Sequence, residues 1–381
     1  MKAVKSSRIL CKDQIVSGYI CFEDGKITAI TQEAPENVDI FDVGDHWVAP
    51  GFIDIHTHGG GGNSFAGSTE EVVSGCNFHL RHGTTSVCPT VSAEYFDAME
   101  QSARNIEKAM QHPDLLGHII GVHMEGPYLS LAQTGAQGAE FITPPIEKDY
   151  LPLLKKMGKA IARWSYAPEN DKDCAFAKSL KEYGVVAAAG HTDALYEDIQ
   201  AAMRHDLRLI THLYSCTSTV TRDHGFRRLG VIESAWLEDD LFVEIIADGK
   251  HLPKDLLRLI YKIKGRDRIV LVTDSLALAG TEATHGFMQS TEYIIEDGVC
   301  KLMDRSAFAG SVATADRLVR VMVQEAGVSV PDAVYMMTET PAQVMGLQNK
   351  GRLAEGFDAD LVVFDDDIHV QRVFVLGQTV L

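Results

Sequence analysis

The sequence is short of positive charge. Its 381 residues carry 35 lysines and arginines against 53 aspartates and glutamates, which gives a formal net charge of −18 at pH 7. Such a chain has no basic excess with which to neutralise the phosphates of a nucleic acid or the headgroups of an anionic membrane. We therefore expect neither nucleic acid nor membrane among its partners, and an anionic substrate would need locally placed positive charge or a metal ion.

The sequence also lacks long apolar runs and paired cysteine motifs. No stretch approaches the ~18 apolar residues of a membrane-spanning helix, and Met1–Leu10 lacks the apolar segment of a signal peptide. The seven cysteines are scattered and form no Cys-x-x-Cys motif, so neither a disulfide framework nor a cysteine zinc site is expected. These absences predict a cytoplasmic protein whose cysteines are reduced.

The composition is otherwise that of a globular protein, with 45% hydrophobic and 23% charged residues. The first fifty residues and the last thirty read as short strands separated by turns such as Asp24-Gly25. Because chain termini often lie close together, the two ends are expected to pair. We predict a small β-sandwich domain built from residues 1–50 and 350–381, and a catalytic domain over residues 51–349.

Between these ends, short apolar runs alternate with stretches of helical pattern. Several runs lack polar alternation, as is typical of parallel strands buried on both faces. Eight alternations favour a (β/α)8 TIM-like barrel, with a doubly wound sheet as the alternative. Residues 286–303 are expected to form an inserted hairpin. The eight predicted strands are Phe52–Ile55, Thr85–Val91, His118–His123, Ala160–Tyr166, Val185–Ala189, Leu207–His212, Leu241–Ala247 and Arg268–Val272.

Ligand-type side chains stand at the ends of these predicted strands. In a barrel the carboxyl ends of all strands meet at one rim, where active sites of this fold are built. Imidazole and carboxylate are suitable zinc or iron ligands, and a catalytic site keeps one position open for water. A single residue of this kind at a strand end can be a hydrogen-bonded structural residue. Ligand-type residues at five strand ends together predict a metal-dependent hydrolase. The residues are His56, His58, Glu125, His191, His212 and Asp274.

The same segments carry a resemblance to a known family. The chain resembles the amidohydrolase superfamily and, within it, is similar to the family of N-acetylglucosamine-6-phosphate deacetylases, from about residue 8 to the C-terminus. Many amidohydrolases bridge two metals with a modified lysine on strand four, but Ala160–Glu169 contains no lysine, so Glu125 fits the deacetylase pattern instead. The matching segments are Pro50–Gly59, His123–Tyr128, Ala167–Glu169, Gly190–Thr192, Thr211–Tyr214, Ala247–His251, Thr273–Ser275, Gly310-Ser311 and Gly356–Val362.

The resemblance implies a metal centre. By it, Glu125, His191 and His212 hold a principal divalent ion, and His56 and His58 hold a second one that Glu125 bridges. The implied cofactor is one or two divalent ions per subunit, with Zn²⁺ as the first choice and Fe²⁺ or another divalent ion as alternatives.

The implied reaction is hydrolysis of the acetamide of N-acetyl-D-glucosamine 6-phosphate to glucosamine 6-phosphate and acetate. A bound divalent ion makes hydroxide available at neutral pH and polarises the carbonyl. Asp274 would accept the proton of the nucleophile as general base and pass it to the departing amine as general acid.

Substrate contacts also follow from the resemblance. His251 matches a histidine that contacts the sugar phosphate, and Ala136-Gln137 match a position near the acetyl group. In place of the family run Asn-Ala-Met, which donates to the phosphate, this chain has Ser215, Cys216 and Thr217, a clear departure.

Arg227 matches an arginine that reaches the phosphate from the neighbouring subunit, which implies a homodimer. Arg222 and Arg228 are alternatives for this role. Arginine suits phosphate because its planar guanidinium bonds in bidentate fashion.

Two other hypotheses remain. The departure at residues 215–217 leaves open a related amidohydrolase that deacetylates N-acetylgalactosamine 6-phosphate, another N-acetyl sugar or an N-acyl amino acid. A catalytically inactive sensor or interaction protein on the same barrel is disfavoured, because such a protein is expected to have lost ligands, whereas Glu125, His191, His212 and Asp274 are all present.

Overall fold

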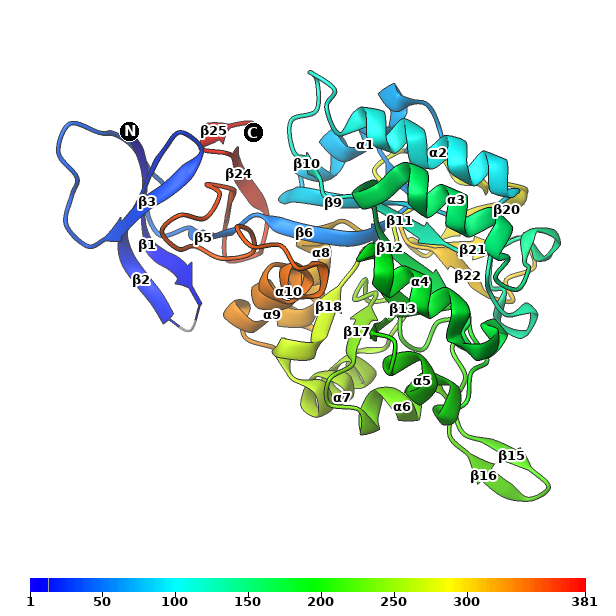
Figure 1. The fold of residues 1–381 in the computed structure, drawn as a ribbon. Helices are drawn as coiled ribbons and strands as arrows, with labels where there is room; N and C mark the ends of the chain where they lie inside the picture. Colours follow the sequence, from blue (N-terminus) through cyan, green and yellow to red (C-terminus); the bar gives the residue numbers. More distant parts are fainter. Residues whose placement is uncertain (13) are drawn as a thin grey trace.

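A barrel of parallel strands occupies the centre of the chain (Figure 1). The structure is a computed structural model that describes residues 1–12 and 14–381. Each neighbouring pair of barrel strands from β6 to β18 is parallel. In chain order the strands are β6 (Phe52–Thr57), β9 (Thr84–Val91), β11 (Val122–Glu125), β12 (Ile161–Tyr166), β13 (Val186–Ala189), β14 (Leu207–Ile210), β17 (Phe242–Ile245) and β18 (Ile269–Leu271).

Backbone hydrogen bonds just beyond β18 close the ring. The amide of Asp274 donates to the carbonyl of His56 over 2.9 Å, and the amide of His58 donates to the carbonyl of Ser275 over 2.8 Å. The eight strand segments predicted from apolar runs therefore form a closed barrel, and the (β/α)8 fold is confirmed. The third predicted strand is divided, because the short β10 (His118–Ile119) pairs with β9 before β11 begins.

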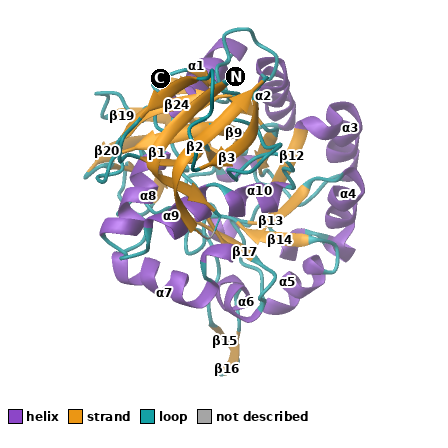
Figure 2. Ribbon diagram, turned by 90° about the vertical axis from the view of Figure 1, so that its left-hand side faces the viewer, coloured by secondary structure: helices purple, strands orange, loops and turns teal. Residues whose placement is uncertain are grey.

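Helices surround the barrel (Figure 2). Their apolar faces pack on the strands, as in α8, where Leu318, Val319 and Met322 are buried. Ser68 and Glu71 form a capping box that begins α1. The helices are α1 (Thr69–Leu80), α2 (Phe96–Ala109), α3 (Glu147–Met157), α4 (Ala175–Tyr183), α5 (Tyr196–Met203), α6 (Val231–Leu237), α7 (Lys254–Lys264), α8 (Ala315–Gln324), α9 (Val330–Met337) and α10 (Glu339–Met345).

The two ends of the chain share one eight-stranded sheet, at the end of the barrel where β6 begins (Figure 1). β1 pairs with β4 through its first residues and with β5 beyond a register shift. The N-terminal and C-terminal strands of this sheet contact each other through aromatic rings. The ring centroids of Phe22 and Phe41 lie 6.1 and 5.6 Å from that of Phe374. The strands are β1 (Lys2–Cys11), β2 (Gln14–Glu23), β3 (Lys26–Thr31), β4 (Asp39–Asp42), β5 (Trp47–Pro50), β23 (Leu361–Phe364), β24 (Val370–Val375) and β25 (Gln378–Thr379).

This sheet contains strands from both predicted terminal segments, and the division of the chain at residues 50 and 350 stays a prediction. No helix among the described residues is long and apolar enough to cross a membrane.

Two insertions stand on the barrel. An antiparallel sheet of β19 (His285–Met288), β20 (Thr291–Glu296), β21 (Val299–Leu302) and β22 (Phe308–Gly310) replaces the single hairpin predicted over residues 286–303. It lies at the end of the barrel opposite the terminal sheet (Figure 1). A two-stranded hairpin of β15 (Thr221–Asp223) and β16 (Phe226–Arg228) projects away from the body of the molecule (Figures 1 and 2).

Candidate metal centre and active site

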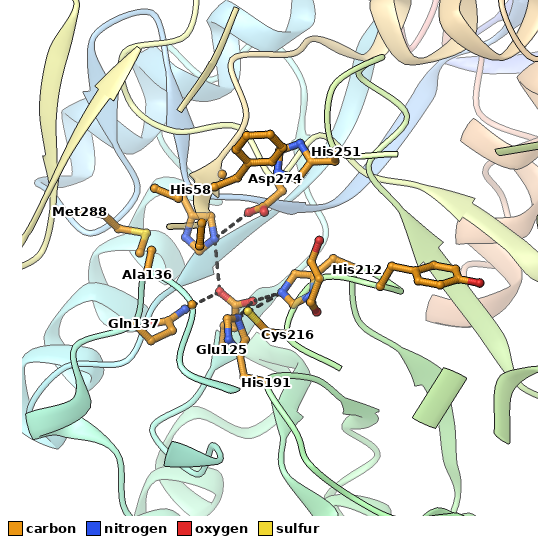
Figure 3. Close-up of a pocket in the computed structure, with 17 residues that line it drawn as sticks. His58, Glu125, Ala136, Gln137, His191, His212, Cys216, His251, Asp274 and Met288 are labelled. Atoms are coloured by element: carbon orange, nitrogen blue, oxygen red, sulfur yellow. Dashed lines mark hydrogen bonds and ion pairs between the residues drawn. The ribbon is translucent and has the colours of Figure 1, made fainter. Parts of the chain in front are cut away.

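The carboxylate of Glu125, the last residue of β11, lies among the imidazoles of His58, His191 and His212 (Figure 3) and also contacts that of His56. Its Oε1 atom is 3.3 Å from Nε2 of His191 and 3.2 Å from Nε2 of His212. The two imidazole nitrogens are 3.1 Å apart. Glu125 ends β11, whereas His191 and His212 follow β13 and β14. The ligand atoms of these three residues lie close enough to hold one metal ion.

A second group of possible ligands shares the same carboxylate. His56 Nε2 lies 3.3 Å from Glu125 Oε1, and His58 Nε2 lies 3.3 Å from Glu125 Oε2. The two nitrogens are 3.3 Å from each other. The structure thus brings all five predicted metal ligands together, with Glu125 common to both groups.

Every imidazole in the centre presents Nε2 to Glu125 and bonds through Nδ1 to another group. The Nδ1 atoms of His191 and His212 contact the carbonyls of Gln133 and Ser215, both at 3.0 Å. The Nδ1 atoms of the other two histidines contact the Glu244 carboxylate at 3.2 Å and the Ser92 hydroxyl at 2.9 Å. Such outer contacts orient ligating histidines and leave the facing nitrogen available to a metal. The donor set therefore fits a divalent ion.

Asp274 lies beside the second group of ligands. Its Oδ1 atom is 3.2 Å from Nε2 of His58 and 3.5 Å from Nε2 of His56. Burial favours the neutral acid, but the nearby His56 and His58 outweigh burial and lower the pKa of the Asp274 carboxyl. Asp274 is therefore an ionised acceptor at the edge of the site.

The protein groups alone make the centre attractive to cations. Burial opposes a charged His56, but the carboxylates of Glu125 and Asp274 raise its pKa to about 10. The pKa of Glu125 is held well below its ordinary value, because the imidazoles around it outweigh the effect of burial. Metal ions and protons compete for such a site.

Three site residues stand on strained backbone. The φ angles of His191, His212 and Asp274 are +48°, +27° and +47°, in the left-handed region that side chains other than glycine rarely adopt. Such strain is common at functional sites, where the surrounding structure holds it in place. The three residues follow β13, β14 and β18 at the rim of the barrel.

A cavity of about 280 Å³ opens above the two ligand groups (Figure 3). The predicted substrate contacts that line it are Ala136, Gln137, Ser215, Cys216 and His251. Gln137 Nε2 donates to Glu125 Oε2 over 2.9 Å. Asp248 Oδ2 holds the ring of His251 through Nδ1 at 2.8 Å.

Insertions complete the walls of the cavity. Met288 and Phe308, from the four-stranded insertion, line it together with the loop that contains Gly135. Gly135 has φ +57°, and a Cβ there would lie 2.6 Å from the sulfur of Cys216. Glycine therefore lets this loop approach the metal centre closely.

Of the predicted site residues, the fully buried His56 contacts the centre from outside the cavity lining, and Arg227 does not reach the cavity. It lies on β16 of the projecting hairpin, where it is exposed and donates to the carbonyl of Gly225 over 3.2 Å. Arg222 is its cross-strand partner, and Arg228 pairs with Glu197 at 3.4 Å. Within one subunit the hairpin points away from the barrel (Figure 1).

Comparison with known proteins places the chain in a family. Residues 47–380 match the Amidohydrolase family. The chain belongs to the amidohydrolase family.

Relatives of this amidohydrolase match along nearly its whole length. It is 29% identical over 365 residues to the N-acetylglucosamine-6-phosphate deacetylase of Lysinibacillus sphaericus, covering 94% of this chain and 92% of the relative. It is 28% identical over 372 residues to the N-acetylgalactosamine-6-phosphate deacetylase of a Shewanella species, covering 97% and 91%. A variant of the N-acetyl-D-glucosamine-6-phosphate deacetylase of Mycobacterium smegmatis, in complex with N-acetyl-D-glucosamine 6-phosphate, superimposes with a TM-score of 0.92 at 27% identity and covers 100% of this chain and 99% of that one.

Sequence reasoning missed the polar residues that lie beneath the candidate metal centre of this amidohydrolase. Arg163 on β12 and Glu244 on β17 form a fully buried ion pair, and Glu244 contacts His56. Burial favours a neutral Glu244, but Arg163 and His56 outweigh it and lower the pKa of the carboxyl. A charged residue inside a strand expected to be buried on both faces was the available signal in both cases.

Proposed function

We propose that the protein hydrolyses the acetamide of N-acetyl-D-glucosamine 6-phosphate to glucosamine 6-phosphate and acetate. The observation that carries this proposal is the position of Glu125 between two pairs of imidazoles, with an ionised Asp274 at the edge of the same centre. The relatives named for this activity support the choice of substrate.

A divalent metal is the cofactor of this proposal, with Zn²⁺ as the first choice. Glu125, His191 and His212 would hold one ion, and His56 and His58 would hold a second one shared through Glu125. Nitrogen and carboxylate ligands suit zinc, and iron(II) accepts the same donors. A bound ion would supply Lewis-acid activation of the water and of the acetamide carbonyl.

Asp274 moves the proton in this mechanism. As an ionised carboxylate 3.2 Å from His58 Nε2, it stands where it accepts a proton from the attacking water. The same carboxyl then gives this proton to the nitrogen of the departing amine, since an amine leaves more easily when protonated. Gln137 has its amide bonded to Glu125 and serves as a neutral neighbour of the acyl group.

The phosphate end of the substrate is assigned to the outer wall of the cavity. Among the described lining residues neither lysine nor arginine occurs, so His251 and the donors of Ser215 and Cys216 are the local candidates. Asp248 accepts from Nδ1 of His251, so Nε2 donates to an oxygen of the phosphate only when the ring is doubly protonated.

Arg227 is proposed to act from a neighbouring subunit. A two-stranded hairpin is only marginally stable by itself, so the exposed β15 and β16 are suited to rest on another surface. A homodimer in which this hairpin reaches the partner's cavity would supply the cation that the lining lacks. The cytoplasmic location expected from the sequence stays a prediction.

N-acetylgalactosamine 6-phosphate is the second candidate substrate. The relative named for that activity in Shewanella matches 97% of the chain. The run Ser215-Cys216-Thr217 at the cavity wall, which departs from the deacetylase pattern, leaves this choice open.

Acetate release tests the proposal directly. Protein loaded with Zn²⁺ is assayed with N-acetylglucosamine 6-phosphate, N-acetylgalactosamine 6-phosphate, their unphosphorylated forms and an N-acetyl amino acid. We expect the highest kcat/KM for the first compound. Equal rates with and without the phosphate would contradict the assigned substrate, and a preference for the galactosamine derivative would favour the second candidate.

A further inference from the structure

A buried ion pair lies directly beneath the metal centre. Arg163 and Glu244 are both 0% exposed, and Nη1 of Arg163 contacts Oε1 of Glu244. The interior of a barrel of this kind is usually filled by branched apolar side chains. Replacing a buried ion pair with apolar residues of similar size is often neutral or stabilising, so packing alone does not account for these charges.

Glu244 connects this ion pair to His56. Its Oε2 atom lies 3.2 Å from Nδ1 of His56. An ionised carboxylate can only accept, so Nδ1 carries a proton and Nε2 is the ring atom available to a metal. By contrast, Nδ1 of His58 contacts the hydroxyl of Ser92, which can donate or accept and does not select a tautomer.

Arg163 holds Glu244 against the first strand of the barrel. Its Nη1 atom also donates to the carbonyl of Ile55 over 2.9 Å, directly before His56 in the chain. Its Nη2 atom donates to the hydroxyl of Ser165 over 3.3 Å. The guanidinium thereby joins strands β6, β12 and β17 at the level just below the ligands.

The other ring beside His56 does not provide the same constraint. His123 packs edge-on against His56 with 4.6 Å between ring centroids. Its own nitrogens contact the hydroxyls of Thr90 and Ser165 at 2.9 and 2.7 Å. His123 therefore limits the tilt of the His56 ring but leaves its tautomer to Glu244.

We propose that Glu244 and Arg163 are positioning residues for the second metal site. Glu244 orients His56 so that Nε2 faces the metal, and Arg163 fixes Glu244. Strand β12 then contributes to the centre through an arginine in the layer below the ligands. This inference rests on the metal centre of the proposed function and is independent of the substrate.

Two double variants test the role of the acceptor. Arg163→Met with Glu244→Leu removes the ion pair and the acceptor for His56 Nδ1 together, so no buried charge is left unpaired. Arg163→Met with Glu244→Gln also removes both charges but keeps an oxygen that can accept from His56 Nδ1. Chelator-treated proteins are titrated with Co²⁺ by calorimetry and by the visible absorption of the bound ion, and a His56→Ala variant identifies which equivalent belongs to the second site.

The leucine variant should bind this second equivalent about 10- to 100-fold more weakly than the wild type. The glutamine variant should recover most of that loss, because it restores the hydrogen bond without the ion pair. Glu244 Oε2 also accepts from the backbone amide of His212 over 3.3 Å. That contact does not reach the imidazole of His212, so the equivalent assigned to His191 and His212 should change less in both variants.

Ile245→Ala is the matched control for lost stability. Ile245 is the neighbour of Glu244 on β17 and is equally buried, but it packs in the large core cluster between strands and helices. It should lower the unfolding temperature and leave both metal affinities unchanged.

Three results would overturn the inference. They are a wild type that binds a single equivalent, folded double variants that bind both equivalents with wild-type affinity, and a glutamine variant that is as weak as the leucine variant. Absence of acetate release from the sugar phosphate would instead contradict the proposed substrate. The metal titration would still test the inference, because it does not depend on the substrate.

Discussion

The Oδ1 atom of Asp274 lies 3.2 Å from Nε2 of His58, and the same nitrogen lies 3.3 Å from Oε2 of Glu125. His58 therefore stands between two carboxylates of different exposure, since the side chain of Asp274 is 12% exposed and that of Glu125 is 2% exposed. The buried carboxylate is suited to hold ions. The one that lines the cavity more openly is suited to exchange protons with a substrate.

Replacing Asp274 with asparagine should separate these two roles. The asparagine side chain would keep the size of the aspartate but could not accept the proton of the attacking water. We expect kcat to fall by about 10²- to 10⁴-fold, while metal content measured by elemental analysis stays near that of the wild type. A metal-loaded Asp274→Asn protein with near wild-type kcat would remove Asp274 from the mechanism.

Glu125→Gln should lose metal as well as activity. The carboxylate lies within 3.3 Å of Nε2 atoms from both ligand groups, and a neutral amide cannot bridge two cations. Elemental analysis after dialysis should show fewer ions per chain. Glu169→Gln is the control, because Glu169 also follows a barrel strand but accepts from Thr192 instead of facing the ligands, so that variant should keep its metal.

Arg227→Ala should weaken recognition of the phosphate. If the hairpin reaches a partner's cavity, KM for the phosphorylated sugar should rise at least tenfold, with little change for the unphosphorylated sugar. Arg222→Ala, on the opposite strand of the hairpin, tests the alternative assignment and should leave KM for the phosphorylated sugar unchanged. Equal effects of Arg227→Ala on both substrates, or a fully active monomer in sedimentation and assay, would contradict the assignment.

Removal of metal should abolish activity reversibly. Dialysis against a chelator should stop acetate release and lower the unfolding temperature, and Zn²⁺ should restore both, since an ion that binds only the folded state stabilises it. Burial opposes a proton on His56, but Glu125 and Asp274 raise its pKa to about 10, so the ion must displace a proton at pH 7. Calorimetry in two buffers of different ionisation enthalpy should therefore show proton release on binding.

Asp360 should make stability depend on pH below 4. Burial favours its neutral form, but His118 and Lys350 outweigh burial and lower its pKa to about 2. A lowered pKa stabilises the folded state above the unfolded value near 4, and this contribution is lost as pH falls toward 2.

Asp360→Asn should thus lower the free energy of unfolding by about 2 kcal/mol at pH 7 and by less at pH 3, as measured by urea unfolding. Asp367→Asn, at an exposed position of the same terminal segment, should leave the free energy of unfolding unchanged at both pH values. A constant difference between wild type and Asp360→Asn across this range would contradict the assignment.

The sequence by itself determined the barrel and the gathering of the candidate metal ligands at one rim. Strands buried on both faces leave unbroken apolar runs, and a barrel requires the residues that follow those runs to meet at one rim. His56, Glu125 and Asp274 could therefore be assigned to one place from their positions in the chain. The local sequence pattern is sufficient for these residues, because a closed barrel brings the carboxyl ends of distant strands together.

Only the tertiary structure decided which distant residues support that centre. The contact between Arg163 and Glu244 joins two strands 81 positions apart, and neither residue follows the apolar pattern of its strand. Only the tertiary structure likewise showed that β5 pairs with β23 across some 300 positions. It also showed that the hairpin carrying Arg227 points away from the cavity of its own subunit. Side-chain partners across a fold depend on three-dimensional packing, which periodicity along the chain does not encode.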